Sequence, residues 1–408
     1  MERTSLSLSS YLRLFLPFAL GYFVSYLFRT VNAVIAPDLI SELGLLPADL
    51  GLLTSAYFLT FAAFQLPLGV LLDRFGSRRV EGLLLLIAAA GAALFATAQS
   101  LPGLIAGRAL IGLGVSACLM AAFKAFSSWL PAARLPFANG VQMVSGGLGA
   151  LFATTPVQAA LRVTDWRGVF FGLAGLTLIA AVVVFFIVPE QRREQSQEGF
   201  REQLSGVARI LTSRRFWRIA PWAFTAQAAY LSVQGLWSGP WLRDVALFDR
   251  NAVAHTLWWI AMAMIAGYFF FGSLAGRLAE RGISPARVAA AGMSLFILVQ
   301  LLLVLIPGFA LPLWLGFGFF GTACILPYAV LSQLFPKHLT GRCNTSLNLL
   351  VFVGAFAAQW LIGAIIGLWP GPPDGGYAAQ GYSAAFLVLI GFQVAAAGWY
   401  WLAGRLRA

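Results

Sequence analysis

The sequence consists largely of long apolar segments that are separated by short polar ones. Twelve apolar windows fall at about residues 14–37, 50–72, 80–99, 102–125, 137–160, 168–189, 217–240, 254–276, 285–306, 310–334, 344–368 and 382–404. A helix needs roughly 20 apolar residues to cross a hydrocarbon core about 30 Å thick. Runs of this length favour helices over the alternating strands of a membrane barrel. The sequence therefore predicts an all-α membrane protein with twelve transmembrane helices.

The composition supports a membrane location. Of the 408 residues, 60% are hydrophobic and 10% are charged, and the mean hydropathy is +0.82. A soluble domain has about 25% charged residues, so these proportions exclude an ordinary soluble protein. The opening residues, MERTSLSLSSYLR, lack the small-residue cleavage site of a signal peptide, and the apolar run that follows is longer than an h-region. We therefore expect the first apolar segment to be retained as a span.

One long polar linker, residues 190–216, separates the sixth window from the seventh. It divides the chain into two predicted six-helix bundles, residues 1–189 and residues 217–408. Within the linker, apolar residues recur at helical spacing among charges: Phe200, Leu204, Val207 and Leu211. This spacing predicts a short amphipathic helix on the membrane surface.

Lysine and arginine are distributed unevenly across the predicted loops. With the N-terminus in the cytoplasm, 20 of the 27 cations fall in cytoplasmic segments, four fall outside and three lie within spans. Cytoplasmic loops are enriched in Lys and Arg, so we expect a multi-pass protein of the bacterial inner membrane with both termini in the cytoplasm. The distribution explains the net charge of +12. It argues against nucleic-acid binding, because the cations flank the spans and do not cluster on a soluble domain.

Two arginines are placed at membrane depth. Arg29 is the only charged residue of the first span, and Arg108 lies within the fourth. Counted from the outer ends of their spans, the two positions differ in depth by roughly 3 Å at 1.5 Å per residue. An intramembrane charge costs at least ~2.5 kcal/mol and usually marks a substrate pathway. Because no carboxylate is expected at that depth, the pair predicts an anion site; the alternative is that both arginines serve helix packing.

The residues of metal sites and enzymes are sparse. Cys118, Cys324 and Cys343 are scattered, so neither a disulfide framework nor a zinc site is expected. Cys118 and Met120 resemble a soft-ligand pair, but residues two apart on a helix point in different directions. The sequence contains no recognisable nucleophile–base pair or phosphate-binding loop. We expect no metal, no cofactor and no enzymatic activity.

The segment after the second span reads GVLLDRFGSRR, at residues 69–79. Its glycines allow helix ends to approach closely, and Asp73 can pair with an arginine or cap a neighbouring helix. It resembles the signature between spans two and three of the major facilitator superfamily, whose fold has two six-helix bundles. The resemblance implies a cytoplasmic gate made of Asp73, Arg74, Gly76 and Arg78. Topogenic charge alone is the alternative explanation, and Gly276 in place of the aspartate predicts a degenerate copy in the second half.

Spans one and four narrow the resemblance. GYFVSYLFRTVNAVIAP, residues 21–37, resembles the first span of the organophosphate:phosphate antiporters and of the anion:cation symporters. In both families an arginine at the position of Arg29 binds the phosphate or carboxylate of the substrate. RALIGLG, residues 108–114, is similar to the fourth-span motif of the superfamily. Span seven lacks the second arginine of the organophosphate antiporters, which argues against phosphate exchange. The acids that the anion symporters often place beside the first-span arginine and in span four are also absent here, so the resemblance does not identify the residue that would carry a coupling proton.

The resulting functional prediction is a secondary transporter that moves a small organic anion by alternating access, with proton symport as the expected coupling and a monomer as the expected state. Polar residues of span seven are the further candidates for substrate contact: Gln227, Tyr230, Gln234 and Trp237. One alternative is efflux of drugs or amphipathic compounds, although span five lacks the Gly-Pro pair of drug:proton antiporters. A second alternative is a transporter-like anion sensor.

Overall fold

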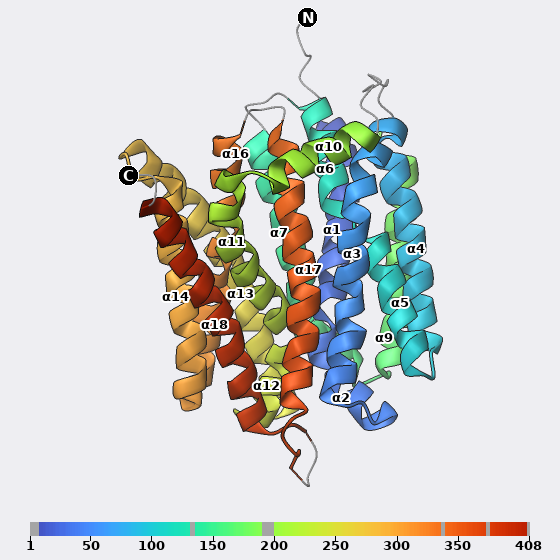
Figure 1. Cartoon of the computed structure of the whole chain (residues 1–408). Coiled ribbons are helices and arrows are strands. Elements are labelled where there is room, and N and C mark those ends of the chain that lie inside the picture. The colour runs from blue at the N-terminus through green and yellow to red at the C-terminus, as the bar shows by residue number, and fades with distance from the viewer. Residues whose placement is uncertain (1–7, 131–134, 190–199, 336–338, 373–375, 406–408) are drawn as a thin grey trace, which may run out of the picture. The chain divides into compact units, whose positions relative to one another are not determined.

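The computed structural model of the protein describes residues 8–130, 135–189, 200–335, 339–372 and 376–405. All regular structure in these residues is helical (Figure 1). Ten helical segments within them are long and apolar enough to cross a membrane. The two other predicted windows, 137–160 and 217–240, are helical as well, but each is divided into shorter helices.

The helices group into two compact units. The N-terminal unit comprises Met1–Val31 and Ala56–Phe200, and the C-terminal unit comprises Asn32–Ser55 and Arg201–Ala408. The N-terminal unit contains α1 (Leu8–Thr30), most of α3 (Pro47–Phe75), α4 (Ser77–Thr97), α5 (Leu101–Gly114), α6 (Cys118–Trp129), α7 (Leu135–Phe152), α8 (Thr155–Ala160) and α9 (Trp166–Ile187).

The C-terminal unit begins with a segment of the first two predicted spans and continues after the linker. Its helices are α2 (Asn32–Leu43), α10 (Phe200–Leu211), α11 (Arg214–Ser232), α12 (Ser238–Asp244), α13 (Arg250–Glu280), α14 (Pro285–Leu305), α15 (Ala310–Gly321), α16 (Leu326–Leu334), α17 (Thr340–Ile366) and α18 (Ala379–Arg405). Helix α10 confirms the helix that the apolar spacing of the linker predicts.

In the N-terminal unit, α4 packs along α5 and α9 (Figure 1). Small residues make this close packing possible, because a Cβ added at Gly107 would lie 2.8 Å from the backbone nitrogen of Phe95. The ring of Phe95 in turn stacks on Phe170 of α9 with 4.2 Å between the ring centroids. The resulting core holds α4 and α5 in a fixed register.

In the C-terminal unit, α11 packs on α17 and α18, and α13 packs on α15. Residues 32–55 pack against this group of helices as part of the same unit. A Cβ added at Gly51 would lie 2.8 Å from the carbonyl oxygen of Gln359, and Arg250 forms an ion pair with Asp38. The end of the first predicted span and the start of the second, within residues 32–55, are thus held by contacts with the second half of the chain.

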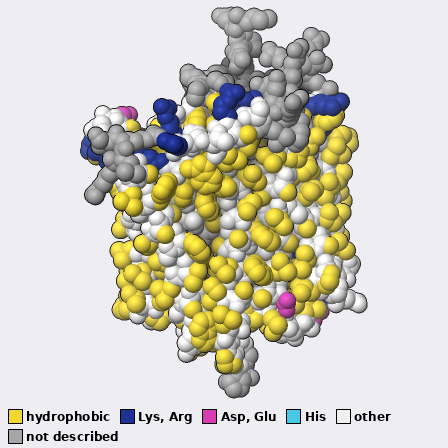
Figure 2. Space-filling view, in the orientation of Figure 1, with side chains coloured by type: hydrophobic (Ala, Val, Ile, Leu, Met, Phe, Trp, Pro, Cys, Tyr) yellow, Lys and Arg dark blue, Asp and Glu magenta, His cyan; other side chains and the backbone are white. Residues whose placement is uncertain are grey.

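The helix flanks are mostly apolar. Figure 2 shows hydrophobic side chains over most of the visible helix surface, with Lys and Arg side chains beside helix ends. Large exposed apolar residues include Leu83, Phe171 and Phe186. Exposed apolar side chains in this number are expected of a protein whose solvent is the lipid bilayer.

Five predicted spans are interrupted at internal positions: the fifth, between α7 and α8, and the four described next. The first span breaks at Val31, between α1 and α2, and the fourth breaks between Gly114 and Cys118. The seventh contains a π-helical turn at Val233–Trp237, and the tenth a 3₁₀ turn at Thr322–Ile325. Spans one and seven, and spans four and ten, hold equivalent places in the two six-span halves. Interrupted helices at equivalent places are typical of the binding helices of transporters.

Candidate anion site

Arg108 is the central residue of the candidate site. Its side chain, on α5, is only 1% exposed, and its Nη1 donates a hydrogen bond of 2.9 Å to the carbonyl oxygen of Phe28. Phe28 lies in the last turn of α1, where the break at Val31 removes the next intrahelical donor. The Nε of Arg108 has no hydrogen-bond partner among the described residues. Arg108 therefore satisfies a helix end and retains one free donor.

Arg29 follows Phe28 directly on α1 and is 7% exposed. Its guanidinium lies over the ring of Tyr26, 4.4 Å from the centroid, and 5.7 Å from the ring centroid of Phe61. Such cation–π contacts stabilise a desolvated arginine by up to about 2 kcal/mol. The side chain is thus oriented by aromatic rings of α1 and α3.

The two arginines share one aromatic cluster. The guanidinium carbon of Arg108 lies 5.2 Å from the ring centroid of Tyr57, whose ring stacks on Phe61 beneath Arg29. The hydroxyl of Tyr57 donates to the carbonyl oxygen of Ser25, which fixes the ring against α1. The structure therefore places the two predicted arginines around the same aromatic pair, next to the end of α1. Two cations in a poorly solvated site favour the binding of an anion.

Two of the four candidate residues of span seven are held by packing in the C-terminal unit. Tyr230 stacks on Phe317 with 5.5 Å between ring centroids, and Trp237 donates from Nε1 to the carbonyl oxygen of Gln359 at 3.0 Å. Both side chains are almost completely buried. These contacts orient the π-helical part of span seven.

The two glutamines of span seven differ from each other. Gln234 lies in the π-helical turn and donates to the sulfur of Met264 at 3.3 Å. Gln227, two turns earlier on α11, is 9% exposed, and its Oε1 has no hydrogen-bond partner among the described residues. Gln227 therefore retains an open hydrogen-bond acceptor among the described residues.

The predicted gate segment forms the sharp connection between α3 and α4. Gly76 separates the two helices with φ +81°, a conformation that favours glycine. Arg74 lies near the ring of Phe75, and Arg78 donates to the carbonyl oxygen of Val188 at 3.3 Å. The side chain of Asp73 lies outside the described residues, so the pairing expected of it stays a prediction.

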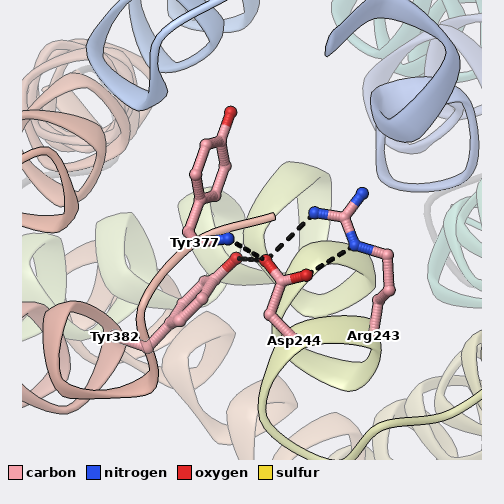
Figure 3. Close-up of polar contacts among 4 residues, drawn as sticks. All are labelled: Arg243, Asp244, Tyr377 and Tyr382. Atoms are coloured by element: carbon pink, nitrogen blue, oxygen red, sulfur yellow. Dashed lines mark hydrogen bonds and ion pairs between the residues drawn. The ribbon is translucent and has the colours of Figure 1, made fainter. Parts of the chain in front are cut away.

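A buried carboxylate network escapes the sequence patterns (Figure 3). Asp244, at the end of α12, accepts hydrogen bonds from Nε and Nη2 of Arg243, from the Tyr377 backbone N–H at 3.1 Å and from the Tyr382 hydroxyl at 2.7 Å. Gly376, with φ +89°, allows the chain to pass against the carboxylate. Burial raises the pKa of the Tyr377 phenol above its usual range. Only the adjacent Arg-Asp pair could have signalled this network, because its two tyrosines are more than 130 residues away along the chain.

The described residues contain no group of three or more His, Cys, Asp or Glu side chains that could hold a metal ion. The buried guanidinium pair is thus the main concentration of charge in the described core of the N-terminal unit. Guanidinium groups in such a setting are suited to bind an anion through hydrogen bonds and charge.

The family model of the major facilitator superfamily matches residues 18–359. The chain belongs to the major facilitator superfamily. The predicted fold of twelve transmembrane helices in two six-helix bundles is thereby confirmed, and the chain is a member of a transporter family and not an enzyme.

Two curated relatives show related sequences. The probable sulfoacetate transporter SauU of Cupriavidus necator is 27% identical over 276 residues, which cover 64% of this chain and 64% of that protein. The hexuronate transporter of Escherichia coli K12 is 26% identical over 255 residues, covering 59% of each chain. The matched regions therefore span less than two thirds of these relatives.

A solved structure shows the same fold over nearly the whole chain. A bacterial homologue of the human lysosomal transporter Spinster superposes with a TM-score of 0.79 at 20% identity, covering 98% of each chain. At this identity the likeness concerns the fold. The family match and the ten long apolar helices show that the protein is a multi-pass membrane protein.

Proposed function

We propose that the protein is a secondary transporter that moves a small organic anion with a carboxylate group, and that Arg29 and Arg108 bind the anionic group. The observation that carries this proposal is the buried guanidinium of Arg108, which satisfies the end of α1 and keeps its Nε free beside Tyr57. A planar guanidinium matches a carboxylate or sulfonate through charge-assisted hydrogen bonds. The names of the two relatives, a sulfoacetate and a hexuronate transporter, support this substrate class.

The break in the first span explains how binding could be linked to movement. Arg108 hydrogen-bonds to the last turn of α1, and Arg29 lies in that same turn. An anion that contacts both arginines would therefore interact with the end of α1, just before the interruption at Val31, and with α5, whose Arg108 satisfies that helix end. In this proposal, alternating access changes the geometry of that interruption, and the gate segment around Gly76 changes with it.

Span seven supplies the second group of candidate contacts. Gln227 is proposed as a hydrogen-bond partner of the substrate because its Oε1 is open. Tyr230, Gln234 and Trp237 hold the π-helical turn in shape and complete this group. We place the protein in the bacterial plasma membrane as a monomer, with both termini in the cytoplasm and with a proton as the coupling ion.

The first experiment measures the melting temperature of the purified protein with sulfoacetate, glucuronate, inorganic phosphate, and one neutral and one cationic compound. A bound ligand at 100 times its Kd stabilises the folded state by about 2.7 kcal/mol. We expect an organic anion to raise the melting temperature of the wild type and not that of Arg29→Ala.

The matched control is Arg167→Ala. Arg167 also donates to a helix-end carbonyl, that of Ala98 at 3.2 Å, and lies over an aromatic ring, that of Trp166 at 4.0 Å. It lies apart from the Tyr57 cluster, so its loss should leave the stabilisation by the anion intact. Equal stabilisation of wild type and Arg29→Ala, by neutral or cationic compounds only, would contradict the proposed substrate class.

A further inference from the structure

A carboxyl group lies inside the N-terminal unit without a counter-ion in contact. Glu81, in the second turn of α4, is 0% exposed, and neither of its carboxyl oxygens has a hydrogen-bond partner among the described residues. Gly21 of α1 faces it so closely that an added Cβ would overlap Oε1. Leu85 lies beside the same glycine, and the thiol of Cys118 on α6 is the polar group next to the carboxyl.

The surroundings of Glu81 provide no neutralising cation in direct contact. From the helices around it, the titratable groups are Tyr11, Arg13, Tyr22, Tyr26 and Arg29 on α1, Arg108 on α5, Cys118 and Lys124 on α6, Arg167 on α9, and Arg78 and Arg79 on α4 itself. Among these, the thiol of Cys118 is the polar group next to Glu81, without a hydrogen bond of normal geometry to it. Arg78 is directed to the carbonyl oxygen of Val188, and Arg108 to that of Phe28. The part of α9 beside Gly82 presents Phe185 and Ala181.

The cost of an unpaired charge decides the form of this carboxyl. An isolated carboxylate in an apolar interior is so unfavourable that the group binds a proton instead. Within a membrane span, an ionisable residue without a structural partner points to a proton relay. The thiol of Cys118 is only a weak hydrogen-bond donor, so it cannot replace a cation.

Glu81 is also linked to the proposed anion site. Gly21, against which the Glu81 carboxyl packs, lies on α1 about two turns before Arg29, so the acid and the arginine proposed to bind the anion contact the same helix. Cys118 also begins α6 directly after the interruption of the fourth span. A change at that interruption would therefore alter the environment of Glu81 together with that of the arginines.

We infer that Glu81 is the residue that binds the coupling proton, an inference that rests on the proposed proton-coupled transport. In the conformation described here the carboxyl is neutral and shielded from water. When the interrupted helices rearrange and water reaches it, the O–H bond breaks and the proton passes to water, leaving the carboxylate. Rebinding of a proton from the other side of the membrane restores the neutral form, and no other bond is made or broken.

The test compares wild type with Glu81→Gln in proteoliposomes loaded with sulfoacetate or glucuronate, whichever stabilises the purified protein. Gln has the size of the neutral glutamic acid but cannot release a proton. We expect Glu81→Gln to lose accumulation driven by a pH gradient and to retain exchange of labelled for unlabelled anion. Glu280→Gln, at the exposed end of α13, is the matched control and should behave as the wild type in both assays.

The outcomes separate the inference from the function on which it rests. Accumulation by Glu81→Gln at the wild-type level would overturn the role of Glu81 and leave the proposed transport intact. Failure of the wild type itself to accumulate anion with a pH gradient would overturn proton coupling, and with it this inference.

Infrared spectroscopy of the purified protein decides the case in which Glu81→Gln is inactive in both assays. A protonated carboxyl has a carbonyl stretch that is absent from a carboxylate. We expect such a band in the wild type and in Glu280→Gln at neutral pH, and its loss in Glu81→Gln. No difference between the three spectra would show that Glu81 is ionised and would overturn the inference.

Discussion

Two buried charged groups of this protein differ in how completely their hydrogen bonds are satisfied. In the C-terminal unit, the carboxylate of Asp244 accepts hydrogen bonds from Arg243, Tyr377 and Tyr382 (Figure 3). In the N-terminal unit, the guanidinium of Arg108 makes one hydrogen bond to a backbone carbonyl and has a free Nε. Buried polar groups normally have all their hydrogen bonds satisfied. A buried group with a full set of protein partners therefore needs only a structural role, whereas a group with an unused donor points to a missing partner such as a ligand. The comparison supports a stabilising role for Asp244 and the binding role that we propose for Arg108.

The largest effect is expected from Asp244→Ala. The side chain of Asp244 is 5% exposed and that of Arg243 is 28% exposed, so the substitution removes a buried acceptor and leaves a partly solvated cation. Breaking a buried ion pair costs about 3–5 kcal/mol, and the partial exposure of Arg243 places this case near 3 kcal/mol. We expect a markedly lower melting temperature in detergent, with the affinity of the remaining folded protein for the anion unchanged. A variant that melts like the wild type would show that the network contributes nothing to stability.

The sequence predicts much of the fold because membrane spans are encoded locally. Apolar length places the helices, and the linker spacing predicts α10. The interruption at Val31 is not encoded so directly, because no proline or glycine marks it. It depends on Arg108, 80 residues away, which satisfies the carbonyl of Phe28. Helix breaks that are stabilised by tertiary contacts are therefore missed by patterns of local sequence.

The candidate site is also predictable in part, because local sequence shows which charged residues lie within a membrane span. The sequence alone identifies Arg29 and Arg108 as candidate site residues, because each is a charged residue within a long apolar segment. Glu81 lies at the inner end of its predicted span, where an acid would ordinarily reach water. Only the packing of Gly21 and Cys118 against it shows that it is completely buried. A single sequence reports depth along a helix but not the face of the helix on which a residue lies.

The substitution Arg108→Lys tests whether the Arg108 guanidinium, with its unused Nε, binds the anion. Lysine keeps the positive charge and can still donate to the carbonyl of Phe28, but it has no planar fork for a second acceptor. We expect anion affinity to fall about tenfold, or about 1.4 kcal/mol, as measured by calorimetric titration. Arg167→Lys is the control and should leave the affinity unchanged. An equal affinity in Arg108→Lys and the wild type would show that the guanidinium serves only the end of α1.

The smallest expected effects come from glycines of the two motif copies, and they have opposite signs. Gly76 adopts φ +81°, so Gly76→Ala should destabilise the protein by about 1 kcal/mol. Gly276 lies within α13 with open space around the position of a Cβ, so Gly276→Ala should stabilise by roughly 0.5–1 kcal/mol. Melting temperatures of the two variants should therefore shift in opposite directions. A lower melting temperature for both variants would mean that the motif copy around Gly276 also requires glycine. The two halves would then differ less than their sequences indicate.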